Sequence, residues 1–254
     1  MKVTILGCGS SGGVPRIGGE WGVCDPGNPK NRRGRCSILV HNNDTTVLID
    51  TSPDMREQLL AAEVADVDGV VWTHDHADQT HGLDDLRVIA IHNRRRVEVW
   101  GDDVTLQRLK KKFGYCFPDG VLPGYPAILN DHLIDGDFDI GSLHFQPFEQ
   151  DHGTMMSLGF RIGNFAYAND VVKLPDHAFE VMAGIDVLVV DALRYTPHPT
   201  HANVEQALEW IERIRPKHAV LTNMHVDLDY ETLKSELPAG VEPAYDGMII
   251  DCDI

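Results

Sequence analysis

The sequence has little of what marks secreted or membrane-bound proteins. It contains no run of about 18 apolar residues, so a membrane-spanning helix is not expected. The N-terminal segment MKVTILGCGS lacks the long apolar stretch and the small-residue cleavage site of a signal peptide. The five cysteines are scattered and form no CxxC pair, which argues against a disulfide framework and against a zinc ribbon. The simplest compartment for such a chain is a reducing cytoplasm.

Positive charge is also scarce. Lys and Arg number 22 against 39 Asp and Glu, which gives a formal net charge of −17. An acidic surface of this kind repels long nucleic acids, so these are not expected as partners. A basic cluster does occur at PKNRRGR, residues 29–35. Charge alone leaves two interpretations of this cluster open, a solvated loop or a contact for a small anionic substrate.

The pattern of apolar residues predicts one α/β domain over residues 1–254. No linker, repeat or low-complexity tract divides the chain. Strands and helices that alternate without a strict βαβ rhythm predict a sandwich, with sheets inside and helices outside. Apolar runs predict buried strands at 69–73, 185–193 and 218–224, and apolar spacing predicts helices at 103–114 and 203–214.

A glycine-rich segment near the N-terminus resembles a dinucleotide fingerprint but lacks its context. GCGSSG, residues 7–12, matches GxGxxG after a predicted strand. The fingerprint needs a helix that opens at the third glycine, whereas Gly13 and Pro15 follow here at once. We therefore expect a glycine turn that lets the backbone pass close to an active site.

The segment THDHADQTHGLDD, residues 73–85, carries the strongest chemical signal. His74 and His76 are separated by one residue and can both face one ion, and Asp78 follows two residues later. The segment comes directly after an apolar strand, which holds the loop rigidly. HxHxD in this position predicts a metal site.

Further polar residues recur at the ends of apolar strands downstream. Each of them taken alone is best explained as a satisfied polar residue, but their joint recurrence favours a common site. They are His152, Asp170, Asp191, His198, His201 and His225.

Together these segments resemble the metallo-β-lactamase superfamily, and within it the phosphodiesterase branch of PhnP-like proteins, with tRNA 3′-processing nucleases as more distant relatives. The supporting blocks are GCGSSGGVP, PKNRRGRCS, THDHADQTHGLDDLR, DHGTMMSLGFRI, YAND, VVDALRYTPHPTHAN and PAYDGM. The resemblance implies a four-layer αββα sandwich, in which two mixed sheets are flanked by helices.

The resemblance also implies roles for individual residues. It implies a first metal ion on His74, His76 and His152, with Asp170 bridging to a second ion that Asp78 also binds. It further implies that His201 assists the leaving group and that Asp191 orients a ligand. The implied cofactor is zinc or manganese, with one or two ions per chain.

Two departures from the family pattern affect the second ion. Gln79 stands where the family has histidine, and Asn223 replaces the final histidine ligand. Three outcomes stay open: His225 replaces the missing ligand, a harder ion binds to Asp78, Asp170 and water, or the protein works with one ion. We expect the first, with a weakly held second ion for which manganese is a candidate.

The implied activity is hydrolysis of small phosphodiesters, such as a cyclic ribose phosphate or a short nucleotide ester. Asp78 would orient the attacking hydroxide, and Arg32, Arg33 and Arg35 would steady the phosphate. Two other classes stay open: a thioester or lactone hydrolase on the same fold, and a nucleotide-binding protein with an impaired second metal site. A homodimer is a further expectation, because homodimers are common among enzymes.

Overall fold

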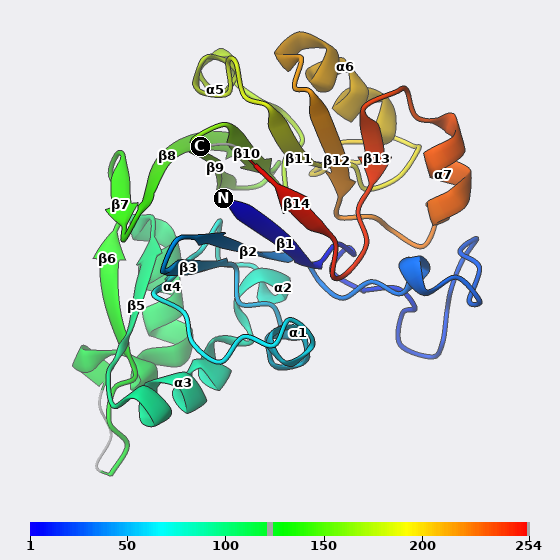
Figure 1. Ribbon diagram of the computed structural model, residues 1–254. Helices are drawn as coiled ribbons and strands as arrows, with labels where there is room; N and C mark the ends of the chain where they lie inside the picture. Colours follow the sequence, from blue (N-terminus) through cyan, green and yellow to red (C-terminus); the bar gives the residue numbers. More distant parts are fainter. Residues whose placement is uncertain (121–123, 253–254) are drawn as a thin grey trace.

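The computed structural model describes residues 1–120 and 124–252, and it builds them into two seven-stranded sheets (Figure 1). The first sheet has the order β14-β1-β2-β3-β4-β5-β6, and the second has the order β13-β12-β11-β10-β9-β8-β7. The strands of the first sheet are β1 Lys2–Gly7, β2 Ser37–Asn42, β3 Thr45–Ile49, β4 Gly69–Val71, β5 Val97–Gly101, β6 Leu129–Leu133 and β14 Ile249–Asp251. Those of the second are β7 Phe138–Ile140, β8 Leu143–Asp151, β9 Met156–Ile162, β10 Phe165–Ala168, β11 Val187–Asp191, β12 His218–Thr222 and β13 Val241–Pro243.

Both sheets are mixed. Strands β3 to β6 pair in parallel, as do strands β10 to β13, while the remaining pairs are antiparallel. The last segment of the chain returns to the first sheet, where β14 lies beside β1 and the Met1 ammonium donates to the Cys252 carbonyl at 2.9 Å. Residues 243–251 divide between the end of β13 and β14, two strands that belong to different sheets.

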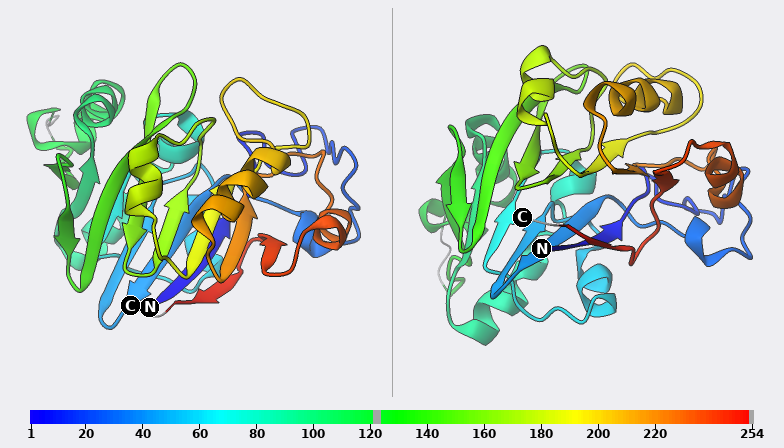
Figure 2. Two further views of the ribbon diagram at one scale, coloured as in Figure 1. Left: turned by 90° about the horizontal axis from the view of Figure 1, so that it is seen from above. Right: turned by 45° about the horizontal axis from the view of Figure 1, so that its top comes forward.

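Helices cover the outer faces of the sheets (Figure 2). They are α1 Met55–Ala61, α2 Ala77–Thr80, α3 Leu86–Asn93, α4 Asp103–Phe113, α5 Asp176–Val181, α6 Val204–Ile214 and α7 Tyr230–Glu236, and 3-10 turns occupy Pro29–Asn31, Leu83–Asp85, Gly114–Cys116 and Pro118–Gly120. Apolar side chains of α1, α3 and α4 pack on the first sheet, while those of α5 and α6 pack on the second. This four-layer arrangement confirms the predicted αββα sandwich. Among the described residues, no helix is long and apolar enough to cross a bilayer.

Apolar residues between the two sheets fill the larger core. Fully buried side chains from both sheets contact one another there, among them Ile5, Val40, Phe145, Phe160 and Val189. Burying this much apolar surface is the main stabilising contribution to the fold. It also fixes the strand ends, and with them the loops that carry the polar residues.

The carboxyl ends of several strands meet at one edge of the sandwich. Parallel strands β10, β11 and β12 end near Asp170, Asp191 and Asn223 respectively, as parallel pairing requires. The loop after β4 joins them from the other sheet, because the Leu158 backbone N–H donates to the Thr73 carbonyl at 2.9 Å. The fold therefore brings segments that lie far apart in the sequence to one place.

Candidate metal centre

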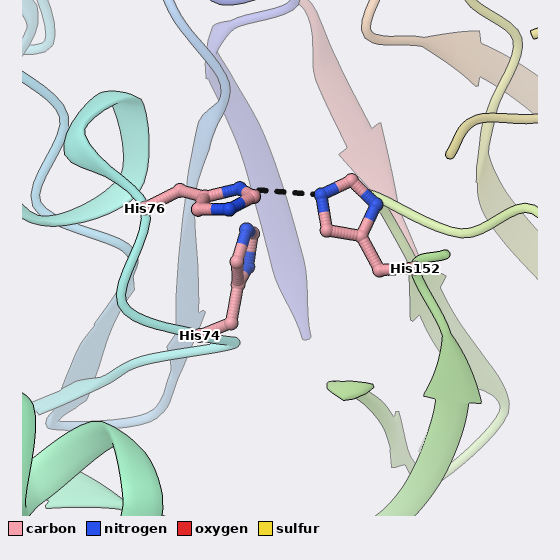
Figure 3. A group of neighbouring side chains, drawn as sticks. All are labelled: His74, His76 and His152. Atoms are coloured by element: carbon pink, nitrogen blue, oxygen red, sulfur yellow. Dashed lines mark hydrogen bonds between the residues drawn. The ribbon is translucent and has the colours of Figure 1, made fainter. Parts of the chain in front are cut away.

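Three imidazole rings from two loops converge at this edge (Figure 3). His74 and His76 come from the loop after β4, and His152 follows the end of β8. One ligating nitrogen from each ring lies within 4.8 Å of the other two, and the His76 Nδ1 atom is 3.2 Å from the His152 Nε2 atom. Such a group of convergent nitrogens is suited to a divalent ion of the zinc type.

Burial and hydrogen bonds prepare His74 and His152 for a cation. Burial lowers the pKa of His74 well below its usual range and lowers that of His152 to about 4, so both rings are neutral near pH 7. A neutral ring is the form that binds a metal ion. The His74 Nε2 atom is buried without a hydrogen-bond partner among the described residues, which is unusual for a buried polar atom. These residues therefore fit the first ion that the sequence predicted.

A relay of hydrogen bonds sets the orientation of His74. Asp50, at the end of β3, is fully buried and accepts from the Thr73 backbone N–H at 2.8 Å and from its hydroxyl at 2.9 Å. The same hydroxyl oxygen lies 3.0 Å from His74 Nδ1 and accepts its hydrogen, which leaves the Nε2 lone pair for a ligand bond. The role of Asp50 was not predicted from the sequence.

His152 is oriented in a similar way. Its Nδ1 atom lies 2.8 Å from the Thr200 carbonyl oxygen, and because a carbonyl only accepts, Nδ1 must carry the hydrogen. The Nε2 lone pair therefore faces His76. The loop that carries His201 thus supports a ligand of the first site.

Asp75, between the two histidines, points away from the rings and anchors the loop. Its carboxylate is almost fully buried and lies 2.7 Å from the Arg108 guanidinium and 2.8 Å from the Lys112 ammonium, both on α4. Lys112 also donates to the Asp75 backbone carbonyl at 2.8 Å. Burial raises the pKa of this carboxyl, but the two cations outweigh burial and lower it. Helix α4 therefore fixes the loop on which two ligands sit.

A second group consists of His152, Asp170 and His201, whose ligand atoms also lie within 4.8 Å of one another. His201 Nδ1 is 2.9 Å from Asp191 Oδ2 and 3.6 Å from Asp170 Oδ1. Burial lowers the pKa of His201, but the Asp191 and Asp170 carboxylates outweigh burial and raise it to about 9. His201 is therefore a cation near pH 7, held between two buried carboxylates.

The two residues that depart from the family pattern contact these same carboxylates. Gln79 Nε2 donates to Asp170 Oδ2 at 2.9 Å. Asn223 Nδ2 lies 3.2 Å from Asp191 Oδ1 and 3.5 Å from Asp170 Oδ1. The structure thus brings both amides to the predicted second metal position.

Asp78, on the first turn of α2, is half-buried and raises the pKa of Asp170 through its charge, but no metal-binding group found among the described residues includes it.

His225 does not reach either group of ligands in the described part of the chain. Its Nδ1 atom lies 2.9 Å from the Asp227 carboxylate, and its Nε2 atom contacts the Arg16 guanidinium. The chain turns at Asn223, which has a φ of +62°, and the buried Met224 then donates its N–H to the Cys8 carbonyl. Beyond this turn the His225 ring lies against Arg16 and Asp227, and its predicted role as the replacement ligand stays a prediction.

The three arginines predicted to hold the phosphate lie elsewhere. Arg33 is buried, with its guanidinium 3.2 Å from Asn31 Oδ1, and Arg35 forms an ion pair with Asp54 at 2.8 Å. The Arg32 guanidinium lies over the Trp21 ring. All three line a groove of about 980 Å³ that runs along β1, β2 and α1 and includes none of the predicted metal ligands. Val14 and Arg33 exchange both backbone hydrogen bonds, which turns Arg33 inward.

A basic pocket instead opens beside His201. Its volume is about 420 Å³, and its lining is Ser10, Ser11, Gly12, Arg16, Leu193, Arg194, His198, His201 and His225. The glycine-rich segment of the N-terminus thus does pass the site, as its sequence predicted. Arg16 was not singled out from the sequence, because its place in the pocket depends on a contact with His225, 209 residues away.

Comparison with known proteins agrees with this geometry. Residues 45–224 match the family model of the beta-lactamase superfamily domain. The chain is 34% identical over 258 aligned residues to an octanoyltransferase of Porphyromonas gingivalis, but it spans only about half (52%) of that protein. That activity belongs to a protein about twice as long as the matched stretch, so it is not carried over to this chain.

Solved structures show a similar fold over the whole chain. A crystal structure of a new diphosphatase from the PhnP family is 35% identical and superposes with a TM-score of 0.92, covering 100% of this chain and 98% of that one. Zinc-bound PqqB from Methylobacterium extorquens (17% identity, TM-score 0.74, 99% and 100% of the two chains) and the human short form of tRNase Z (17%, 0.73, 100% of both chains) share the fold alone. This chain belongs to the metallo-β-lactamase superfamily, within its PhnP branch.

Proposed function

We propose that this metal-dependent hydrolase is a phosphodiesterase that acts on small ribose-phosphate or nucleotide esters, including diphosphate esters. The observation that carries the proposal is the neighbourhood of three elements: the imidazole group of His74, His76 and His152, the charged pair of His201 and Asp191, and the basic pocket. The similarity to a PhnP-family diphosphatase supports a phosphorus ester as the substrate class.

His74, His76 and His152 would hold the ion, with Asp170 Oδ1 beside them at 3.9 Å from His152 Nε2. A divalent ion supplies charge that polarises a phosphoryl oxygen and lowers the pKa of a water molecule. Asp78 would accept a hydrogen bond from the attacking water and orient it. Its position on the first turn of α2, close enough for its charge to affect Asp170, supports this role.

His201 would protonate the leaving oxygen. Its Nδ1 atom is held by Asp191, so Nε2 is the nitrogen left to meet a substrate, and the residue lines the basic pocket. A carboxylate that holds the far side of an imidazole both orients the ring and stabilises its charged form. The raised pKa keeps the proton available near pH 7.

The basic pocket would receive an anionic part of the ester next to the reacting phosphorus. Arg16 and Arg194 contribute positive charge to its wall, and His198 lies against His201 with ring centroids 5.1 Å apart. Arginine pairs well with phosphate oxygens because its N–H groups form a planar fork. This pocket therefore replaces residues 29–35 as the proposed phosphate contact.

A substrate panel tests the class of reaction. Protein loaded with Mn²⁺ or Zn²⁺ is assayed against bis(p-nitrophenyl) phosphate, a nucleoside diphosphate ester, a thioester and a lactone. The proposal predicts hydrolysis of the phosphorus esters and its loss in a His76→Ala variant. Turnover of only the thioester or the lactone would contradict it. Tight mononucleotide binding without any turnover would identify a binding protein.

A further inference from the structure

The place where the family implies a second metal ion is crowded with hydrogen-bond donors in this chain. A second ion would need ligand atoms from positions 78, 79, 170 and 223, and two of these positions carry side-chain amides. An amide nitrogen has no lone pair available for a metal ion, and its hydrogens seek an acceptor. The question is whether these amides face the carboxylates with nitrogen or with oxygen.

The contacts of Asp170 show that the Gln79 amide faces it with nitrogen. Its Oδ2 atom accepts from Gln79 Nε2 at 2.9 Å and from Asn169 Nδ2 at 2.6 Å. A Gln79 oxygen turned toward the same carboxylate would be repelled by it at this distance. Two N–H donors thus occupy Asp170 Oδ2, which leaves Oδ1 as the oxygen that faces His152 and His201.

Asn223 also faces the carboxylates with its amide nitrogen. Its Nδ2 atom faces Asp191 Oδ1 at 3.2 Å and Asp170 Oδ1 at 3.5 Å, while its Oδ1 atom lies 3.8 Å from the buried Cys36 thiol, which donates to it. Turning the amide over would set its oxygen against two carboxylates and its hydrogens against the thiol. The orientation that satisfies both carboxylates and the thiol therefore points the amide N–H groups at the metal position, where Nδ2 also lies 3.0 Å from His201 Nδ1.

Few ligand atoms remain for a second zinc-type site. The group of His152, Asp170 and His201 shares His152 with the first ion, and the Nδ1 atom of its His201 is bonded to Asp191. Gln79 Oε1 is buried without a hydrogen-bond partner among the described residues, so it is a free acceptor, but a neutral one. Asp78 is the other candidate, and it joins no metal-binding group in the described ranges. One carboxylate and one neutral oxygen bind zinc far more weakly than three imidazoles do.

We infer that this chain holds a single divalent ion, on His74, His76 and His152, and that the Gln79 and Asn223 amides hold Asp170 and Asp191 in the place of a second ion. This goes beyond the proposed phosphodiesterase and rests on it only for the first ion. It also selects the single-ion outcome among the three that the sequence left open.

The test is a metal count that does not depend on activity. Protein stripped with chelator is dialysed against Zn²⁺ and, separately, Mn²⁺, and bound metal per chain is measured by inductively coupled plasma mass spectrometry. We expect one equivalent in the wild type and two in a Gln79→His/Asn223→His double variant. Gln107→His, on the exposed face of α4, is the matched control and should add no tightly held ion.

Each result bears on the inference. Two equivalents of similar affinity in the wild type overturn it and leave the proposed function standing. No bound ion overturns both. One equivalent of bound metal in the wild type that is lost in a His152→Ala variant supports the inference, even where the double variant does not fold. A folded double variant that still binds one ion contradicts the role given to the amides.

Discussion

The Nδ1 nitrogen of His201 lies 2.9 Å from Oδ2 of Asp191, and the fold brings the two side chains together although they are 10 residues apart in the sequence. Asp191 is the last residue of β11 and fully buried, whereas His201 lies in the loop before α6. Asp191 Oδ2 also accepts from the Val171 backbone N–H at 3.0 Å, which ties it to the segment after β10. This pair sets the charge of the proposed general acid.

Replacing His201 should affect turnover more than metal content. His201→Gln removes the proton donor but leaves the three imidazoles of the first ion in place, so kcat on a phosphodiester should fall roughly 10²–10⁴-fold. Bound metal should stay at the wild-type level. A parallel loss of metal and turnover would show that His201 serves as a ligand.

The pH dependence should depend on Asp191. The carboxylates raise the pKa of His201 to about 9, so the protonated form is present below that pH and is lost as pH rises through it. A bound cation repels this proton, so the alkaline limb of kcat/KM should lie at or below pH 9. Asp191→Asn should move the limb to lower pH, by roughly 1–3 units. An unmoved limb in a folded variant would rule out His201 as the titrating acid.

Helix α4 should contribute to the stability of the ligand loop. Truncating Arg108 and Lys112 to Ala leaves the buried Asp75 carboxylate without its partners, which should lower the free energy of unfolding by about 1–3 kcal/mol. Urea unfolding of the double variant measures this loss. Lys111→Ala on the same helix is the matched control. Equal free energies of unfolding for the two variants would mean that the Asp75 contacts do not stabilise the fold.

Arg16 should matter for substrates that carry a second anionic group beside the reacting phosphorus. Because it lines the basic pocket, Arg16→Ala should raise KM for a nucleoside diphosphate ester by about 10-fold or more, as expected for the loss of a charge-assisted hydrogen bond. KM for bis(p-nitrophenyl) phosphate should change little. Arg32→Ala, in the separate groove, is the control. A similar rise in KM for both substrates, or a rise in the Arg32 variant, would contradict the assignment.

The sequence predicted the first metal site because its signal is local and repeated. His74 and His76 share one short loop after an apolar strand of the first sheet, and His152 follows a strand of the second, so strand ends at one edge of the sandwich bring them together. The same reasoning located Asp170 and Asp191. The four-layer fold was likewise accessible from several separate blocks of sequence.

Charge and spacing were not enough for the residues around this site. Arg33 has the right charge for a phosphate contact, but two backbone bonds to Val14 turn it into the protein. His225 is only two residues from Asn223, yet the turn between them sends its ring elsewhere. Arg16 and Asp50 act through contacts that only the folded chain creates, so nothing in their own neighbourhood in the sequence revealed them.

Restoration of hydrolysis by added metal tests whether His74, His76 and His152 hold the ion on which phosphodiester cleavage depends. Chelator-treated wild type and a His152→Asn variant are titrated with Mn²⁺ or Zn²⁺, and bis(p-nitrophenyl) phosphate hydrolysis is followed with bound metal. We expect that wild-type activity rises in proportion to the first equivalent and that the variant neither binds this equivalent nor gains activity. Full activity in the chelated protein, or in the variant without bound metal, would contradict it.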